Sequence, residues 1–217
     1  VGKHTLLSNT TGASNVAVGS FALDANTTAS NNVAIGAYAA SANTSGASNT
    51  VVGYAALGAN TTGNYNVAIG QDALNDNTTA SNNTAVGYRA VRDNSTGANN
   101  TGIGFFALIS NTTGGSNTAV GSSALDANTT GNNNSSLGEG SLSGNTTASN
   151  NTAVGHDSLK LTTTGAGNTA VGKDSLKANT TAGNNTAVGM DALTANTTGT
   201  NNTALGVNAL KSTTTTN

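Results

Sequence analysis

The chain of 217 residues has no cysteine, proline or tryptophan, and only 7% of its residues are charged. Without cysteine the chain forms no disulfides, and this absence is compatible with secretion but does not demonstrate it. The formal net charge of −2 provides no electrostatic basis for binding nucleic acid or an anionic membrane. No run approaches the roughly 18 apolar residues of a transmembrane helix. These absences exclude disulfide-rich, nucleic-acid-binding and membrane-inserted classes.

Residues for catalysis and cofactor binding are also scarce. The two histidines, His4 and His156, lie far apart, and no group of His, Cys or carboxylate residues has the spacing of metal ligands. The column of Asp157, Asp174 and Asp191 is interpreted as a solvated edge rather than a cation site. We therefore expect no enzymatic activity, no cofactor and no bound metal.

What the chain does contain is a glycine at every seventeenth residue. A fixed short period predicts one small unit stacked many times rather than a domain with a unique core. We expect residues 1–217 to form a single repeat array that belongs to a longer fibrous protein. With this glycine as position 0, the repeat glycines are Gly2, Gly19, Gly36, Gly53, Gly70, Gly87, Gly104, Gly121, Gly138, Gly155, Gly172, Gly189 and Gly206.

The other repeat positions predict the shape of one unit. Position −4 is Asn, −3 is mostly Val or Thr, −2 is small, −1 is aliphatic and +4 is mostly Leu. Alternation over −3 to −1 predicts a strand, the glycine a corner with positive φ, and the Ala-Leu pair at +3 and +4 a second extended piece. Asn-Thr-Thr at +7 to +9 predicts a turn. The sequence thus predicts an all-β parallel solenoid with one coil per repeat and about 13 coils.

Stacked coils place each residue above its own copy, about 4.8 Å away. We expect an aliphatic core from −1 and +4, amide ladders from the Asn at −4 and +7, and hydroxyl columns from Thr at +8 and +9. Two aliphatic columns form a thin core, so we expect the rod to associate with identical chains. Representative ladder residues are Asn15, Asn32, Asn117, Gly19, Gly36, Gly121, Val18, Val120, Leu23 and Leu125.

Variation is confined to the edge of the coil. All charged residues occur at +1, +2, +5 or +6, and six of the seven aromatic residues occur at +1 or +2, Tyr65 being the exception. These positions either vary because they are exposed, or they form a strip that contacts a partner chain or a glycan. The candidate contact residues are Phe21, Tyr38, Tyr54, Tyr88, Phe105 and Phe106.

The Asn-Thr-Thr turns also match the acceptor pattern for N-glycosylation. Such a pattern occurs at position +7, and the candidate sites are Asn26, Asn60, Asn128 and Asn196. The competing interpretation is that these asparagines form the turn ladder itself. A regular Thr array also suggests ice binding, but +8 and +9 are adjacent and would face opposite ways on a strand, so this alternative is less favoured.

The segments Asn117–Gly121 and Asn151–Gly155, each with a small residue and Leu at +3 and +4, resemble the head repeats of trimeric autotransporter adhesins. They are also similar to repeat shafts of phage tail fibres. The resemblance covers nearly all of the chain, although its repeat is longer, with the extra residues in the Asn-Thr-Thr turn. It implies a left-handed, trimeric β-roll in an extracellular fibre, adhesin or virion appendage that mediates surface attachment. The alternative is a glycan-binding module that uses the exposed aromatic residues to engage host or cell-surface glycans or receptors.

Overall fold

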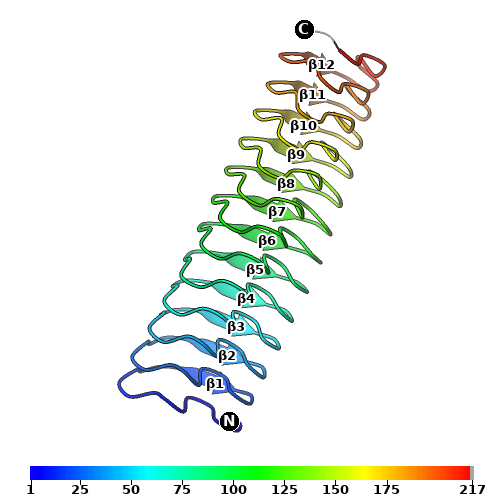
Figure 1. Ribbon diagram of the computed structural model, residues 1–217. Coiled ribbons are helices and arrows are strands. Elements are labelled where there is room, and N and C mark those ends of the chain that lie inside the picture. Colours follow the sequence, from blue (N-terminus) through cyan, green and yellow to red (C-terminus); the bar gives the residue numbers. More distant parts are fainter. Residues whose placement is uncertain (216–217) are drawn as a thin grey trace.

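A computed structural model describes residues 1–215 as a straight-sided stack of coils with the two ends of the chain at opposite ends of the rod (Figure 1). Within these residues there is no helix, and hence none long and apolar enough to cross a membrane. The strands are β1 (Val16–Val18), β2 (Val33–Ile35), β3 (Thr50–Val52), β4 (Val67–Ile69), β5 (Thr84–Val86), β6 (Thr101–Ile103), β7 (Thr118–Val120), β8 (Ser135–Leu137), β9 (Thr152–Val154), β10 (Thr169–Val171), β11 (Thr186–Val188) and β12 (Thr203–Leu205).

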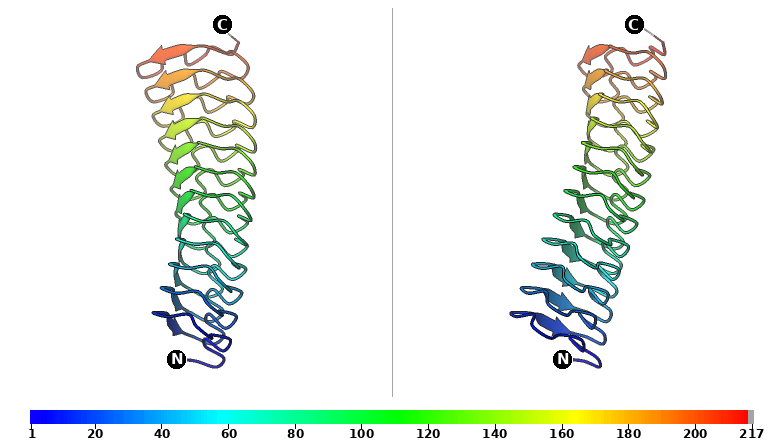
Figure 2. Two further views of the ribbon diagram at one scale, coloured as in Figure 1. Left: turned by 90° about the vertical axis from the view of Figure 1, so that its left-hand side faces the viewer. Right: turned by 60° about the vertical axis from the view of Figure 1, so that its left-hand side comes forward.

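All the strands belong to one parallel sheet in which the order of neighbours is the order along the chain. Val16 pairs with Val33 and Val18 with Ile35, so equivalent repeat positions lie side by side (Figure 2). The parallel solenoid is therefore confirmed. The count differs slightly from the predicted 13 coils: the sheet has 12 strands, because only Val1 precedes Gly2 and the first corner has no complete strand before it.

The invariant glycine forms the predicted corner at the end of each strand. Its φ lies between 121° and 146° in every repeat. A Cβ added to Gly87 would lie only 2.4 Å from the carbonyl oxygen of Gly104 in the next coil. Glycine is required here for two reasons. Residues with a side chain rarely adopt this φ, and successive corners approach too closely for a methyl group.

The interior of the rod contains the small residues at −2 and +3 and the large residue at +4. Leu23 and Leu125 are completely buried, as predicted. The prediction of a core column at −1 is wrong: Val18 is 42% exposed and Val120 is half-buried, whereas their neighbours Ala17 and Ala119 face inward. Alternate strand residues point to opposite faces, so filling the interior with −2 places −3 and −1 outside.

The Ala-Leu tract is not the second extended piece that the sequence suggested. Positions +2 and +4 have left-handed backbone conformation in each repeat, for example Phe106 with φ 58° and Leu108 with φ 54°. The tract is a series of turns, which the structure uses to reverse the chain within a few residues. These turns direct +4 into the interior and leave +1, +2, +5 and +6 on the outer edge.

Candidate interaction surfaces

The Asn at +7 forms an amide ladder through the buried side of the turn. Asn111 Nδ2 donates to Asn94 Oδ1 at 2.7 Å and to the Gly114 carbonyl oxygen at 2.9 Å, while Asn128 Nδ2 donates to Asn111 Oδ1 at 2.8 Å. All three asparagines are fully buried. The ladder thus satisfies side-chain amides that would otherwise be costly to bury, and it links each coil to the next.

The Asn at −4 forms a different ladder, mainly between side chain and backbone. The backbone N–H of Asn117 donates to Asn100 Oδ1 at 3.0 Å, and Asn117 Nδ2 donates to the Gly131 carbonyl oxygen at 2.8 Å. One asparagine therefore bonds to the coil before it and to the coil after it. This dual role explains why position −4 is always Asn, whereas the prediction anticipated only amide-to-amide contacts.

The turn asparagines are not accessible as glycosylation sites in the folded chain. Asn26, Asn60, Asn128 and Asn196 are each 0% exposed, and their Nδ2 atoms donate within the ladder. The structure therefore disfavours N-glycosylation of these asparagines in the folded chain, because the nitrogen that would carry the glycan is buried and hydrogen-bonded.

The two threonines of each turn have different environments. At +8, Thr112 Oγ1 donates to the Thr129 carbonyl oxygen at 3.0 Å. At +9, Thr113 and its equivalents are exposed. The +9 column is therefore the more exposed of the two, whereas the +8 column, which is mostly half-buried, joins neighbouring coils.

The outer face of the sheet is an uncharged surface that sequence reasoning missed. It consists of an aliphatic column at −1 beside a column of Val, Thr or Ser at −3, and no repeat carries a charge at either position. Its exposed members include Ile35 at 40%, Ile69 at 38%, Ile103 at 39% and Leu137 at 50%. The signal that could have revealed it is residue size: the residue at −2, which faces the narrow interior, is smaller than its neighbours at −3 and −1 in most strands.

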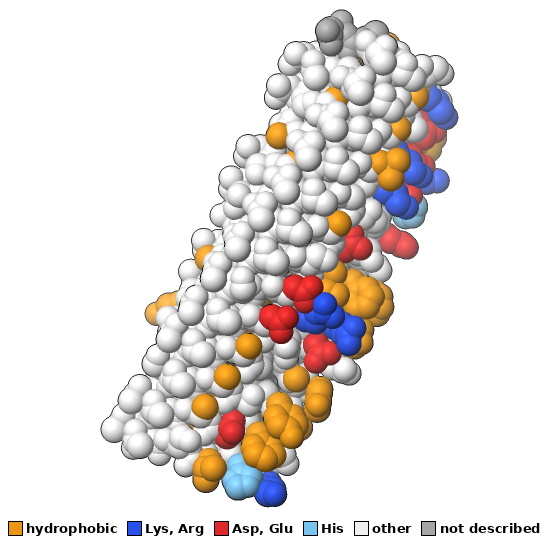
Figure 3. Space-filling model, viewed as in Figure 1, with side chains coloured by type: hydrophobic (Ala, Val, Ile, Leu, Met, Phe, Trp, Pro, Cys, Tyr) orange, Lys and Arg blue, Asp and Glu red, His pale blue; other side chains and the backbone are white. Residues whose placement is uncertain are grey.

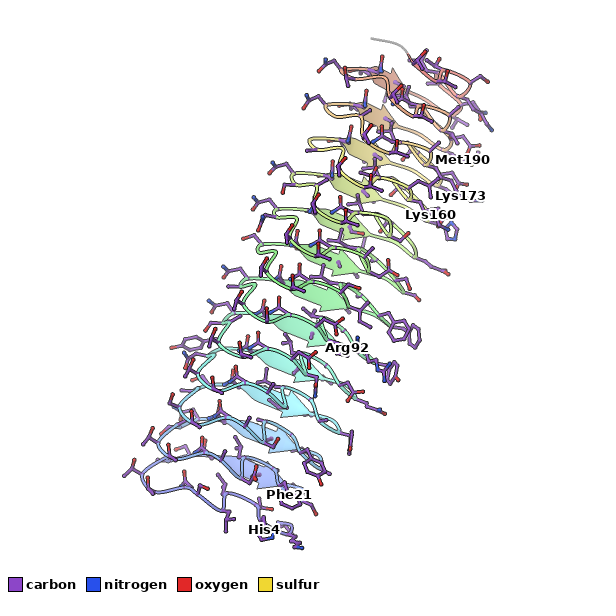
Figure 4. The ribbon with its side chains drawn as sticks, in the orientation of Figure 1. His4, Phe21, Arg92, Lys160, Lys173 and Met190 are labelled. Atoms are coloured by element: carbon purple, nitrogen blue, oxygen red, sulfur yellow. The ribbon has the colours of Figure 1, made fainter. Side chains whose placement is uncertain are left out.

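The aromatic residues form two separate stacks on the variable edge of the rod (Figures 3 and 4). In the first, the ring centroids of Phe21 and Tyr38 are 5.1 Å apart and those of Tyr38 and Tyr54 are 5.9 Å apart. In the second, Tyr88 lies 5.6 Å from both Phe105 and Phe106. No ring contact joins the two stacks within residues 1–215.

Stacking limits what the aromatic edge offers to a ligand. The rings of Phe21 and Tyr38 are nearly parallel, with an interplanar angle of 4°, so each covers a face of the other. Tyr54 and Phe105 are still 54% and 50% exposed. A sugar that binds by stacking needs a free ring face, and the face of Phe21 is already occupied by stacking with both His4 and Tyr38. The arrangement favours a role in holding coils together over a continuous stacking platform.

Charged residues continue the same edge toward the C-terminal end, where Lys160 and Lys173 project from neighbouring coils (Figure 4). Lys160 Nζ lies 3.0 Å from Asp157, and Lys177 Nζ lies 3.1 Å from Asp157 and 2.8 Å from Asp174. His156, Asp157 and Asp174 place ligand atoms within 4.8 Å of one another. Lysine ammonium groups already neutralise both carboxylates, which makes the cluster an ion-pair network rather than a metal centre.

This network predicts a weak dependence of stability on pH. Burial acts to raise the pKa of Asp157, but hydrogen bonds from Lys160 and Lys177 outweigh it and lower that pKa below the ordinary 3.8. The stabilisation is present above pH 3.8 and is lost as the pH falls through the lower pKa of the folded state. Because both lysines are partly exposed, we expect it to be worth less than about 1 kcal/mol.

The measurement is the thermal unfolding midpoint of the native chain and of Asp157→Asn between neutral and strongly acidic pH. The variant should lose part of the acid sensitivity. Asp126→Asn serves as the contrast, because burial raises the pKa of Asp126 and gives its titration the opposite sign. Equal acid sensitivity in the native chain and in Asp157→Asn would contradict the prediction.

No protein-family model matches the chain, and no curated protein or solved structure has significant similarity to it. The rod offers three surfaces to a partner: the uncharged sheet face, the exposed Thr column at +9, and the edge that carries the aromatic and charged residues.

Proposed function

We propose that this chain is a rod-forming segment of an extracellular or virion-associated fibre or adhesin, which associates with identical chains and mediates surface attachment. The observation that supports this most is the partly exposed aliphatic column at position −1 of the uncharged sheet face. A continuous apolar strip along a whole rod is a liability in water unless another molecule covers it. The aliphatic residue at −1 in every repeat contributes little to the chain's own interior.

A second copy of the chain is the partner that best fits this face. A partner that contacts every coil must present its own groups at the axial spacing of the coils, about 4.8 Å. This rod has that spacing itself and carries no charge on the face that would repel an identical face. The resemblance of the repeat to trimeric adhesin heads agrees with three such chains.

The face also favours a parallel arrangement of the copies. Position −3 is Val in three of the first four strands, at Val16, Val33 and Val67, with Thr50 in β3, and it is Thr or Ser in every strand from Thr84 onward. Parallel copies in register place valine against valine, whereas antiparallel copies place these valines against hydroxyl groups. A parallel bundle would leave each variable edge available for contact with a surface.

The glycan-binding alternative is supported by the exposure of Tyr54 and Phe105 on that edge. It ranks second because the rings stack on one another, as described above. In a glycan-binding experiment, Tyr54→Ala and Phe105→Ala should abolish retention while leaving assembly intact if this alternative holds.

The assembly prediction concerns the double variant Ile69→Asp, Ile103→Asp, which places two carboxylates on the sheet face. We expect association to weaken by at least about 100-fold, because carboxylates in apolar contact between like chains are strongly unfavourable. The control is Thr62→Asp, Thr96→Asp, which introduces the same charges at exposed turn positions of the same coils. Sedimentation measures the mass and circular dichroism the retained β-structure. If the native chain sedimented as a stable folded monomer at micromolar concentration, the proposal that it associates with identical chains would be refuted.

The parallel arrangement has its own test, because the chain contains no cysteine. With Val18→Cys, a short bismaleimide should link identical positions of neighbouring chains. Antiparallel chains would instead link only in a mixture of the Val18→Cys and Leu205→Cys variants. Oligomers that link only in the mixture would refute the parallel register but leave assembly standing.

A further inference from the structure

The amide ladder at position +7 is interrupted within the rod. Thr162 stands where the coils before and after it have Asn145 and Asn179. Thr162 has no amide to donate, so Asn145 Oδ1 is buried without a hydrogen-bond partner. Thr162 and Asn179 are joined only by contacts of 3.3 Å, longer than the 2.7 to 2.8 Å bonds around Asn111.

The inner column at +3 is altered at the same place. Most coils have Ala at this position, but three consecutive coils have Ser141, Ser158 and Ser175. Ser141 and Ser175 find acceptors in the Gly138 and Gly172 carbonyl oxygens, whereas Ser158 Oγ is buried without a partner. A buried hydroxyl and a buried amide oxygen therefore both lack partners near the contact between coil 138–154 and coil 155–171.

The outer edge provides no compensation at this contact. Within residues 1–215, ring stacking extends only as far as Phe106, and the next ion pair beyond it that bridges two coils joins Asp157 to Lys177. Between these contacts the edge carries Ser123, Glu139 and Gly140, which line a shallow hollow and form no ring contact or ion pair. Within residues 1–215, no ring contact or ion pair joins coil 138–154 to coil 155–171.

A second ladder defect shows why the edge matters. Thr213 replaces Asn in the coil that follows Asn196, and Asn196 Oδ1 is likewise buried without a partner. There, however, Lys211 Nζ lies 2.8 Å from Asp191 and bridges the two coils. Among the contacts between coils in residues 1–215, only the one between β9 and β10 combines a defect in the +7 ladder with an edge that has no bridging pair.

We propose that this contact is a built-in weak joint, at which the rod opens before any other internal contact. In a stack each coil touches only its neighbours, so stability is a sum of local terms and a defect is not averaged over the whole chain. The backbone hydrogen bonds continue across the joint, for example from Leu142 N to the Ser158 carbonyl oxygen at 3.0 Å, so it is closed at rest. The joint separates the segment that carries both aromatic stacks from the segment that carries the Asp157–Lys177 and Asp191–Lys211 bridges.

The experiment is hydrogen exchange, read by mass spectrometry on the native assembly. Leu142 and Leu108 occupy the same position in different coils, and each donates its N–H to the next coil. We expect the Leu142 amide to exchange at least about tenfold faster, the ratio expected for one unsatisfied buried carbonyl. Thr162→Asn restores the ladder and should slow exchange at Leu142 about tenfold, without affecting Leu108.

The matched control is Thr164→Asn, the same change at an exposed position two residues later. It should leave exchange at the joint unchanged. Ser158→Ala provides an independent check, because it removes the unpaired hydroxyl and introduces the residue that most coils have; it too should slow exchange at Leu142. The proposal of a weak joint would be refuted if amide exchange were uniform along the rod, or if neither Thr162→Asn nor Ser158→Ala slowed exchange at Leu142.

Discussion

Replacement of Gly87 by alanine is expected to unfold the coils around it, with a loss of more than about 3 kcal/mol in the free energy of unfolding. Two costs combine. The φ of Gly87 is 135°, which alanine rarely adopts, and the new methyl carbon would lie 2.4 Å from the Gly104 carbonyl oxygen. The neighbouring backbone cannot retreat, because Gly104 forms the same corner and is itself stacked against Gly121.

The measurement is chemical denaturation followed by circular dichroism, at matched protein concentration because assembly contributes to stability. The control is Gly115→Ala, at a position where the preceding coil already has Ala98. Its methyl carbon would lie 3.2 Å from the nearest atom, and we expect a change within about 0.5 kcal/mol. If the free energy of unfolding fell equally little in both variants, the glycine corner would not be the element that determines the shape of the coil.

Replacement of Asn111 by alanine is expected to lower the free energy of unfolding by about 3 to 5 kcal/mol. The variant loses the bonds to Asn94 Oδ1, to the Gly114 carbonyl oxygen and from Asn128 Nδ2. Because the site is fully buried, water does not replace them. Alanine also leaves the amide oxygen of Asn94 without a donor, which reproduces the defect seen at Asn145.

Thr113→Ala is the control for this variant, since Thr113 is two residues away and exposed. We expect it to stay within about 0.5 kcal/mol of the native chain. Both variants should keep the parallel β-structure at low denaturant, so the comparison reports stability rather than loss of fold. An Asn111→Ala variant as stable as Thr113→Ala would show that the ladder does not hold the coils together.

The period and the identity of the most constant residues were sufficient to predict the solenoid, the glycine corner and the asparagine ladder at +7. Each of these follows from translation by one coil, which places Asn111 between Asn94 and Asn128 whatever the shape of the coil. Chemistry that repeats along an axis can therefore be predicted without knowing the cross-section. The same reasoning placed charges and aromatic residues on a single edge.

The sequence by itself thus determined the stacking direction, the ladder and the variable edge. Only the tertiary structure decided which side of each strand faces inward, that Phe21 and Phe106 belong to separate stacks, and that the Ala-Leu tract turns. The physical reason is that alternation along a strand specifies two faces but not which is inside. That choice depends on closing a coil of 17 residues, where the corner at glycine and the left-handed turns around Leu108 leave room for alanine and expose the larger Val and Ile.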